Sequence, residues 1–345
     1  MFIRTGFLSA LLLGSISLVS GQQQCNGYSE FCSKPYNELT YVLTHNSYAY
    51  AANPASTQMC GITSQLADGV RALKLSAVKA ENSSSSMNLC HTSCSILDAG
   101  PATDTLSKIA SWLKDNPDEV LSIFWNIPNH DFEASDFQSP YQSSGLLDYA
   151  HVQNANNYTW PTLGEMISSG KRLVNYVESG ADQASVPWLH PEFSYNFQTP
   201  YENSNASDFS CTIDRPSDPS NPSEMMYGMN HYLYGNLPMG SNTIQVPQSG
   251  SANKTNSEGS LLAQAKECTQ TFGRAPNFLI VDFYNRGQTL QIAAQLNNVT
   301  FQNTTALQCD AQNTSSDDST GASATLVAAP FVTALVSVAV VMTFL

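Results

Sequence analysis

The chain has 345 residues, with 14 Lys and Arg, 28 Asp and Glu, and a formal net charge of −14. Proteins that bind nucleic acids or other polyanions carry patches of Lys and Arg, so this composition argues against that class. Hydrophobic residues make up 42% of the chain and aromatic residues 10%, which excludes a disordered protein and is enough for a large core.

The first 21 residues have the pattern of a signal peptide. Arg4 provides the positive charge, residues 7–19 (FLSALLLGSISLV) are apolar, and Gly21 is small enough for a cleavage position. An uncleaved membrane anchor is the alternative, but the apolar run is short for a span. We expect residues 1–21 to be removed, so that the mature chain begins near Gln22.

Segments typical of strands and of helices alternate through the rest of the chain. β-Branched and aromatic residues predict strands at residues 39–44, 70–78, 87–91, 119–127, 171–178, 225–233 and 277–284. Apolar residues at helical spacing predict helices at residues 64–68, 104–116, 163–169 and 261–272. The polar residues 199–223 are predicted to form a surface loop. This alternation predicts an α/β fold, a TIM-type (β/α)8 barrel in regular or distorted form, within residues 22–308.

The eight cysteines all lie after the predicted signal peptide and before the apolar C-terminal tail. An even number of cysteines in a secreted chain favours disulfides, which would staple the loops of the barrel. A zinc site is the weaker alternative, because an oxidising compartment favours disulfides. Spacing alone does not fix the pairing of Cys25, Cys32, Cys60, Cys90, Cys94, Cys211, Cys268 and Cys309.

The composition of the C-terminus matches a glycosylphosphatidylinositol (GPI) signal. Residues 324–345 carry no charge, and residues 309–323 before them are small and polar. We expect the tail to be exchanged for a GPI anchor within residues 313–321, with Ser316 or Ser319 favoured as the attachment residue. A single tail-anchored helix is the alternative. The anchor would hold the protein on the outer face of the plasma membrane or in the cell wall.

Asn-x-Ser/Thr sequons also fit a glycoprotein at the cell surface. A seventh sequon, at Asn313, lies in the predicted attachment region. We expect glycosylation at the other six, which are Asn82, Asn157, Asn205, Asn253, Asn298 and Asn303.

Several polar residues stand at or near the ends of predicted strands, where barrel enzymes place their active sites. Two of them are histidines, His45 and His91, and two imidazoles facing one pocket suit phosphodiester cleavage by general base and general acid. Arg71 is expected to be a structural residue that pairs with a carboxylate. The other polar residues of this set are Asn46, Lys74, Ser76, Asn126, Glu178, Asn230, His231 and Asp282.

Together these motifs resemble the X domain of phosphatidylinositol-specific phospholipase C. The resemblance rests on residues 44–48 (THNSY), 65–66 (QL), 69–71 (GVR) and His91. Residues 114–119 (KDNPDE), 191–193 (PEF), 211–216 (CTIDRP) and 281–285 (VDFYN) extend it to fungal secreted phospholipase C-like phosphodiesterases. It covers residues 25–302.

The resemblance implies a role for each of the main site residues. His45 would be the general base that takes the proton of an inositol 2-hydroxyl, and His91 the general acid on the lipid leaving group. Asp282 would orient one imidazole. Asn46 matches a position that is a calcium ligand in metal-dependent members. We expect the substrate to contact Asn46, Lys74, Ser76, Glu178 and His231.

The sequence departs from the family at Lys74 and Ser76. Metal-dependent members carry two acidic calcium ligands there, whereas metal-free bacterial members carry an Asp and an Arg. Calcium needs several carboxylate oxygens, so we expect no metal and no cofactor. Lys74 is expected either to supply the positive charge for the phosphate or to form a structural ion pair.

The expected activity is therefore cleavage of an inositol phospholipid or a related glycolipid by a monomeric, GPI-anchored phosphodiesterase. The alternative is a catalytically degenerate barrel that acts as a binding or wall-structural glycoprotein. A metal-dependent glycerophosphodiesterase is a third possibility, but it would need strand-end carboxylates beside His45.

Overall fold

The computed structural model describes residues 23–80, 87–239 and 242–302. The predicted signal peptide, the attachment region with Ser316 and the apolar tail lie outside the described residues. The sequons at Asn82 and Asn303 also lie outside them.

Eight parallel strands form the centre of the molecule. They are β1 (Tyr41–Thr44), β2 (Ala72–Lys79), β5 (Leu121–Asn126), β6 (Leu173–Val177), β7 (Leu189–Pro191), β8 (Asn196–Gln198), β9 (Met226–Asn230) and β12 (Phe278–Val281). Their order in the sheet is β7-β6-β5-β2-β1-β12-β9-β8, so the first of them pairs with the last. The sheet ends at β7 and β8, which are joined by α5 (Glu192–Tyr195) and leave one open seam. This confirms the predicted α/β barrel, in a distorted form.

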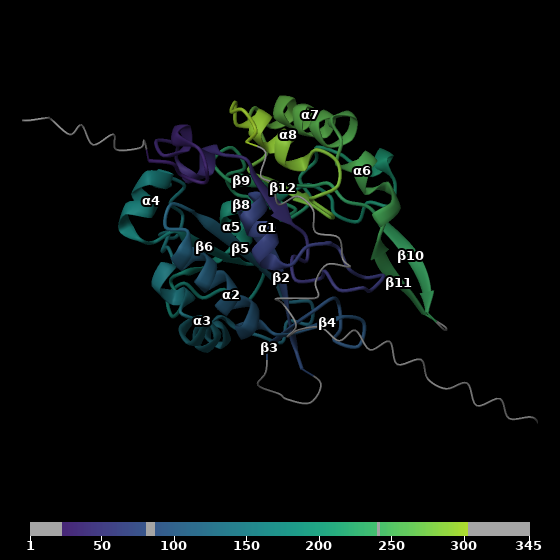
Figure 1. Ribbon diagram of the computed structural model, residues 1–345, viewed down its shortest axis with the longest axis horizontal. Helices are drawn as coiled ribbons and strands as arrows, with labels where there is room; N and C mark the ends of the chain where they lie inside the picture. The colour runs from purple at the N-terminus through teal and green to yellow at the C-terminus, as the bar shows by residue number, and fades with distance from the viewer. Residues whose placement is uncertain (1–22, 81–86, 240–241, 303–345) are drawn as a thin grey trace, which may run out of the picture.

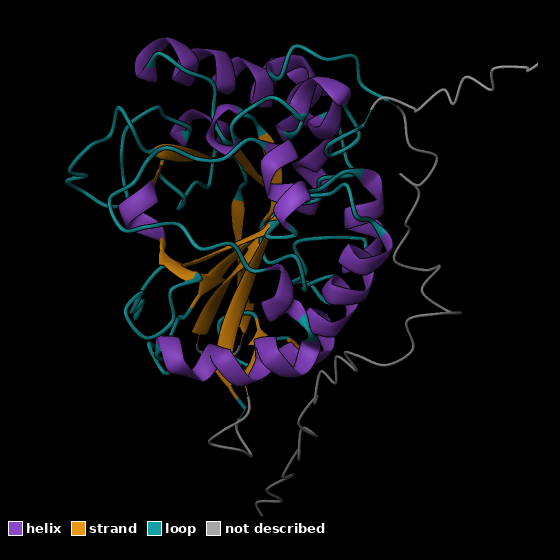
Figure 2. Ribbon diagram, turned by 90° about the vertical axis from the view of Figure 1, so that its left-hand side faces the viewer, coloured by secondary structure: helices purple, strands orange, loops and turns teal. Residues whose placement is uncertain are grey.

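Helices cover the outside of the curved sheet (Figure 1, Figure 2). The α-helices besides α5 are α1 (Ile62–Asp68), α2 (Ala102–Asp115), α3 (Gln138–Ser144), α4 (Leu163–Ser169), α6 (Ala252–Thr255), α7 (Ala263–Phe272) and α8 (Thr289–Leu296). A π-helical turn (Glu258–Leu262) leads into α7. Short 3-10 helices lie at Ser29–Phe31, Tyr36–Glu38, Ala134–Phe137, Leu146–Tyr149, Ala206–Asp208 and Ser249–Ser251.

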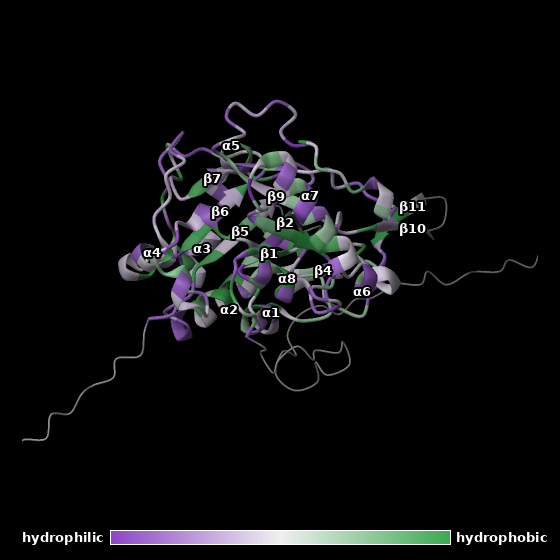
Figure 3. Cartoon of the chain, turned by 90° about the horizontal axis from the view of Figure 1, so that it is seen from above, coloured by the Kyte–Doolittle hydropathy of each residue, from purple (hydrophilic) through white to green (hydrophobic). Residues whose placement is uncertain are grey.

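The side chains of the strands alternate between two apolar layers. In β5, Phe124 packs with Tyr176 and Phe278 inside the barrel, whereas Ile123 and Trp125 pack toward the helices. Figure 3 shows the hydrophobic strands at the centre and the hydrophilic stretches around them. The same alternation places Lys74 and Ser76 on the interior side of β2, because Leu73 and Leu75 belong to the outer layer.

The strand predicted at residues 87–91 is present, but it is not part of the barrel. β3 (Met87–Cys90) pairs antiparallel with the end of β2 and with β4 (Asp98–Pro101), so it is an extension of β2 and not a barrel strand.

A second hairpin, β10 (Tyr234–Met239) and β11 (Asn242–Pro247), forms its own two-stranded sheet and projects from the body (Figure 1).

Disulfides confirm the expectation of stapled loops. The described residues contain Cys25–Cys32, Cys90–Cys94 and Cys211–Cys268. The third joins the loop after β8 to α7. Among the helices of the described residues, none has the length and apolar character needed to cross a membrane.

Candidate active site

His45 and Asp282 follow two neighbouring strands. Thr44 of β1 pairs in register with Val281 of β12, so the next residue of each strand lies at the same edge of the sheet. His45 Nδ1 and Asp282 Oδ1 are 2.9 Å apart, and both side chains are buried. The aspartate therefore fixes the orientation of the imidazole.

Further contacts hold both the ring and the backbone of His45. Tyr232 stacks on it with the ring centroids 4.3 Å apart and the planes 5° from parallel. Thr57 Oγ1 and Gln58 Nε2 each donate to the carbonyl oxygen of His45, at 2.9 Å. Nε2 has no hydrogen-bond partner among the described side chains and backbone groups, so it is the atom available for a substrate.

His91 reaches the site through the β3–β4 hairpin. The Cys90–Cys94 disulfide closes the turn that carries it, and Tyr48 Oη donates to the carbonyl oxygen of Cys90 at 2.8 Å. The backbone N–H of His91 donates to the carbonyl oxygen of Leu97 at 3.1 Å. These bonds fix the backbone on both sides of the imidazole.

Burial lowers the pKa of both histidines. The pKa of His45 falls to about 3, mainly through burial and further through the charges of Lys74 and Arg215. The pKa of His91 falls to about 4, again mainly through burial and then through the nearby imidazole of His45. Both rings are therefore neutral at pH 7 in the free protein, and the two are close enough to interact.

Asn46 and Ser76 form a polar contact beside the histidines. Ser76 Oγ donates to Asn46 Oδ1 at 3.1 Å, which joins β2 to the turn after β1. Asn46 has a positive φ of 43°, a conformation that asparagine tolerates better than most residues. At the ends of β5 and β6, the amide of Asn126 lies against the carboxylate of Glu178.

Lys74 is buried inside the barrel. Burial lowers the pKa of its ammonium group, and the charges of Glu192 and Glu178 partly oppose that effect. The ammonium has no hydrogen bond or ion pair within 4 Å among the described residues. Negative charges therefore act on Lys74, but its ammonium has no direct hydrogen-bond or ion-pair partner among the described residues.

The structure adds Glu192 and Arg215 to this charged group, and sequence reasoning did not assign them to the site. Arg215 Nη2 donates to Gln198 Oε1 at 2.7 Å, and Nη1 is 3.7 Å from Glu178 Oε2. Gln198 Nε2 also donates to Glu192 Oε1. Both residues lie in segments, 191–193 and 211–216, that carry part of the family resemblance. The resemblance of these segments was the signal that could have pointed to Glu192 and Arg215. The residue types in them did not indicate that either side chain faces the site.

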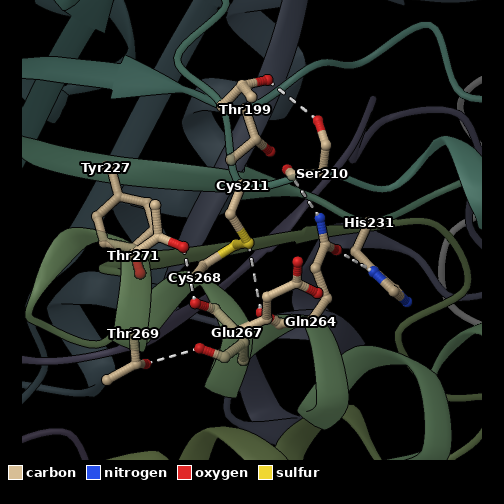
Figure 4. The surroundings of a disulfide bond; sticks show 12 residues. Thr199, Ser210, Cys211, Tyr227, His231, Gln264, Glu267, Cys268, Thr269 and Thr271 are labelled. Carbon is tan, nitrogen blue, oxygen red and sulfur yellow. Dashed lines mark hydrogen bonds between the residues drawn. A yellow bond between two sulfur atoms is a disulfide. The ribbon is translucent and has the colours of Figure 1, made fainter.

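His231 was expected to contact the substrate, and its surroundings do not favour that role. Its Nδ1 bonds Gln264 Oε1, and its Nε2 lies 2.8 Å from the carbonyl oxygen of Thr255. The ring is fully buried and stacks on Phe209 at 4.0 Å. Figure 4 shows it turned toward Gln264, beside the Cys211–Cys268 disulfide. With both ring nitrogens engaged, His231 is left out of the substrate-binding set proposed below.

The prediction for Arg71 is confirmed. Its Nε lies 2.7 Å from Glu119 Oε2, and its Nη1 donates to the carbonyl oxygens of Leu66 and Val70. Arg71 precedes β2, at the strand end opposite the histidines. It therefore joins elements of the fold rather than taking part in the site.

The donor atoms near the histidines do not resemble a calcium site. Within residues 23–80, 87–239 and 242–302, the single group of metal-type ligands is Cys90, Cys94 and Asp98, and the two cysteines form a disulfide. Asn46 has Ser76 as its neighbour where calcium would require carboxylates. The carboxylate beside His45 belongs to Asp282, which already bonds the imidazole.

The described sequons lie on or near the surface. Asn205, Asn253 and Asn298 are exposed, and Asn157 is half-buried. Their positions are compatible with glycosylation, which stays a prediction.

Comparison with known families identifies the fold. The PI-PLC X family model (PI-PLC X 1) matches residues 31–297. The chain belongs to the PI-PLC X domain family. A PI-PLC X domain-containing protein 1 of Arthroderma benhamiae is 34% identical over 302 residues, which cover 84% of this chain and 96% of that protein. An uncharacterized secreted protein of the same fungus is 39% identical over 293 residues. That match covers 80% of this chain and 64% of the relative, so this chain matches less than two thirds of that protein.

Solved structures show the same PI-PLC fold at low sequence identity. The phosphatidylinositol-specific phospholipase C from Listeria monocytogenes matches with a TM-score of 0.51 and 14% identity, over 78% of this chain and 96% of that one. A double mutant of the Staphylococcus aureus enzyme matches with a TM-score of 0.50 and 13% identity, over 77% and 94%. At such identities the similarity describes the barrel and assigns no activity to this PI-PLC X protein.

Proposed function

We propose that this PI-PLC X protein is a phosphodiesterase that cleaves an inositol phospholipid or a related glycolipid. The observation that carries the proposal is the 2.9 Å contact between His45 Nδ1 and Asp282 Oδ1, which leaves His45 Nε2 open to a substrate beside a second imidazole, His91. Two histidines with separate roles are sufficient for acid–base cleavage of a phosphodiester.

The reaction is an internal transfer at phosphorus. His45 Nε2 takes the proton of the inositol 2-hydroxyl, whose oxygen then forms a bond to phosphorus. The bond from phosphorus to the lipid oxygen breaks, and His91, which must enter this step as the imidazolium, gives its proton to that oxygen. The products are a cyclic inositol phosphate and the free lipid alcohol. Asp282 accepts the Nδ1–H of His45 and stabilises the imidazolium that forms.

Positive charge must balance the developing charge on the phosphoryl oxygens. Lys74 supplies it in this proposal, and Asn46, Ser76 and Glu178 supply hydrogen-bonding groups toward the headgroup. The protein is proposed to act without calcium or another cofactor, because Lys74 and Ser76 stand where metal-dependent members carry acidic ligands.

The proposed location is outside the cell. Three disulfides favour an oxidising compartment, and the predicted signal peptide and a relative named as secreted agree with it. Anchoring through GPI, glycosylation and a monomeric state belong to the same proposal.

The experiment measures product release by the purified protein from phosphatidylinositol and from a GPI-anchored reporter, with and without EDTA. We expect a cyclic inositol phosphate in both conditions. His45→Ala and His91→Ala should each lower the rate by about 10²–10⁴-fold, because each removes a general acid or base. His151→Ala is the matched control, since the backbone N–H of His151 bonds the carbonyl oxygen of Leu173 at the start of β6, the strand end opposite the site, and His151 has no role in the proposed chemistry.

Release of no product by the folded protein would overturn the proposal for these substrates. Equal rates for the wild type and both site variants would overturn the roles of the two histidines. Loss of activity in EDTA that calcium restores would overturn the metal-free mechanism.

A binding protein without catalysis is the second candidate function. The observation that favours it is the burial of Lys74, whose pKa is affected by the charges of Glu192 and Glu178, because a buried charged cluster that serves only the fold would also produce it. Retention of the protein on phosphatidylinositol vesicles without any product would support it.

A further inference from the structure

The barrel has one open seam, between β7 and β8. β7 ends at Pro191 and β8 begins at Asn196, and the sheet does not continue between them. The one-turn helix α5 fills the chain between these strands and carries Glu192, which is buried. The seam leaves one edge of β7 and one edge of β8 without the neighbouring strand that a closed barrel would provide.

Arg215 spans this seam. Its backbone N–H donates to the carbonyl oxygen of Gln198 at 3.4 Å and its carbonyl oxygen accepts from the N–H of Gln198 at 2.8 Å, next to the end of β8. Its guanidinium extends from Gln198 toward Glu178, which follows β6. The ring of Tyr201 lies under the guanidinium, 4.2 Å from its central carbon. One side chain is therefore positioned by β8, by β6 and by an aromatic ring.

The contacts of Arg215 leave part of its hydrogen-bonding capacity unused. A guanidinium has five N–H donors, and in the described residues Nη2 serves Gln198 while Nη1 stands 3.7 Å from Glu178. The Nε–H is buried and has no partner. Buried N–H donors usually have a hydrogen-bond acceptor, so we expect a bound ligand to provide one for the Nε–H of Arg215.

The positive charges of Arg215 and Lys74 both affect the imidazole of His45. The positive charges of both lower the pKa of His45 and oppose the rise in the pKa of Glu192, and the charge of Arg215 also lowers the pKa of Lys74. Electrostatic effects of this kind require proximity, so the two cations lie near the imidazole that would activate the attacking hydroxyl. The Lys74 ammonium likewise lacks a direct partner among the described groups.

We propose that Arg215 binds the substrate phosphate together with Lys74, so that the positive charge missing from β2 comes from the loop across the open seam. This inference rests on the proposed phosphodiesterase function and names a further substrate-contacting residue for it. Arginine suits the role because its planar fork can hold two phosphate oxygens at once, whereas lysine acts as a single point charge.

The charges of the group agree with a singly charged phosphodiester. Lys74 and Arg215 contribute two positive charges, and Glu178 contributes one negative charge. Burial raises the pKa of Glu192, which favours its neutral form, although Lys74 and Arg215 oppose that effect. The closer Glu192 comes to its neutral form, the more positive the group becomes, which favours an anionic phosphodiester.

A purely structural role for Arg215 is the competing explanation, and three variants separate the two. Arg215→Met removes the charge, and Arg215→Lys keeps the charge but removes the fork. Arg274→Met is the matched control, because Arg274 also packs over two aromatic rings, Phe197 and Tyr227, and donates to the backbone of Met225 away from the site. Melting temperatures and circular dichroism establish that each variant is folded.

The experiment measures kcat/KM on phosphatidylinositol and the binding of inorganic phosphate by calorimetry. We expect Arg215→Met to lower kcat/KM by about 10²–10³-fold, the usual cost of losing one such donor, and to abolish phosphate binding. The kcat/KM of Arg215→Lys should be at least about tenfold lower than that of the wild type, because one of the two phosphate oxygens held by the fork loses its partner. The folded fraction of Arg274→Met should keep both the kcat/KM and the phosphate binding of the wild type.

Two outcomes overturn the inference. One is a kcat/KM for Arg215→Met no lower than that of Arg274→Met with phosphate binding retained. The other is an unfolded Arg215→Met together with an unimpaired Arg215→Lys, which would make Arg215 a structural clasp. If the wild type binds phosphate through Arg215 but cleaves no phosphatidylinositol, the phosphodiesterase proposal fails while the anion site stands.

Discussion

His45 and His91 carry the proposed chemistry, and their low pKa values have a consequence for the pH dependence. The general base must be neutral, which requires a pH above about 3, the pKa of His45. Asp282 must also be ionised, and burial raises its pKa well above the usual value, so the acid limb of the profile lies above pH 3. The general acid must be protonated, so kcat/KM falls as the pH rises through about 4, the pKa of His91. The profile of kcat/KM reports the free protein.

We therefore predict an acidic optimum for kcat/KM on phosphatidylinositol, below pH 5. In the complex, the negative charge of the bound phosphate favours the imidazolium of His91, so the alkaline limb of kcat should lie at higher pH than that of kcat/KM. Initial rates measured from pH 3 to pH 8 at low and saturating substrate test both statements. A kcat/KM that is maximal at pH 8 would contradict them.

His231 gives a prediction about stability rather than activity. Replacing it with Gln leaves at least one of its partners, Gln264 or the Thr255 carbonyl, without a hydrogen bond inside the protein. His231→Gln should lower the free energy of unfolding by about 1–3 kcal/mol at pH 7. The kcat of the folded fraction should stay near that of the wild type.

The destabilisation caused by His231→Gln should shrink as the solution becomes acidic. The pKa of His231 is about 4 in the folded protein because of burial, against 6.5 without burial. The unfolded wild type therefore binds a proton between pH 6.5 and 4 while the folded protein does not, and the wild type loses stability in that window. Denaturant unfolding at pH 7 and pH 4 measures this, and a constant difference between the two proteins would contradict it.

The sequence predicted the residues of the histidine pair but not all of their neighbours. His45 and Asp282 directly follow strands that periodicity predicts well, and parallel strands bring their ends together. Arg215 and Glu192 stand in a loop and a one-turn helix, and no local pattern shows that either faces Lys74. His231 follows a strand too, but packing against α7 turns it toward Gln264.

At the scale of elements, boundaries were predicted best where local chemistry sets them. The helix at residues 163–169 was predicted with the observed bounds, because Thr162 and Glu165 form a capping box at its start and Gly170 adopts φ 72° at its end. The segment that carries His91 was predicted as a barrel strand but folds back antiparallel on β2. Whether a strand runs parallel or antiparallel to its neighbour depends on which strands pair, and the residues of a single strand do not encode it.

The loop that carries Arg215 depends on the Cys211–Cys268 disulfide. Its cysteines are 57 residues apart in the sequence, whereas Cys25 and Cys32 are 7 apart. In the chain-entropy account, the longer loop contributes about 4 kcal/mol and the shorter about 2.5 kcal/mol. The double variant Cys211→Ala/Cys268→Ala should therefore lower the free energy of unfolding more than Cys25→Ala/Cys32→Ala.

Denaturant unfolding of the two double variants measures this difference, and the rate on phosphatidylinositol separates their effects on the site. Only the Cys211→Ala/Cys268→Ala protein should also lose activity per folded molecule, because Cys211 lies four positions before Arg215. Equal losses of activity in the two variants would show that the disulfide does not position the loop.

At the scale of the whole molecule, charge opposes approach to an anionic membrane. The net charge is −14, and removal of Arg4 with the signal peptide makes it −15, from 13 basic and 28 acidic residues. We predict that binding to phosphatidylinositol-containing vesicles increases as ionic strength rises from 0.01 to 0.15 M, because the Debye length falls from about 30 to about 8 Å. Sedimentation of the protein with vesicles measures it, with phosphatidylcholine vesicles as the control. Binding that weakens with salt would instead indicate a local positive surface.

The sequence by itself determined the fold class, the expectation of disulfides and the strand ends that carry His45 and Asp282. Those features depend on residue periodicity, on cysteine number and on the rule that parallel strands end at one edge, all of which act locally along the chain. Only the tertiary structure decided the open seam between β7 and β8, the antiparallel direction of β3, the inward turn of Arg215 and the outward turn of His231. These depend on which strands pair and on which side chains fill the space between distant segments, and that is set by packing of the whole chain.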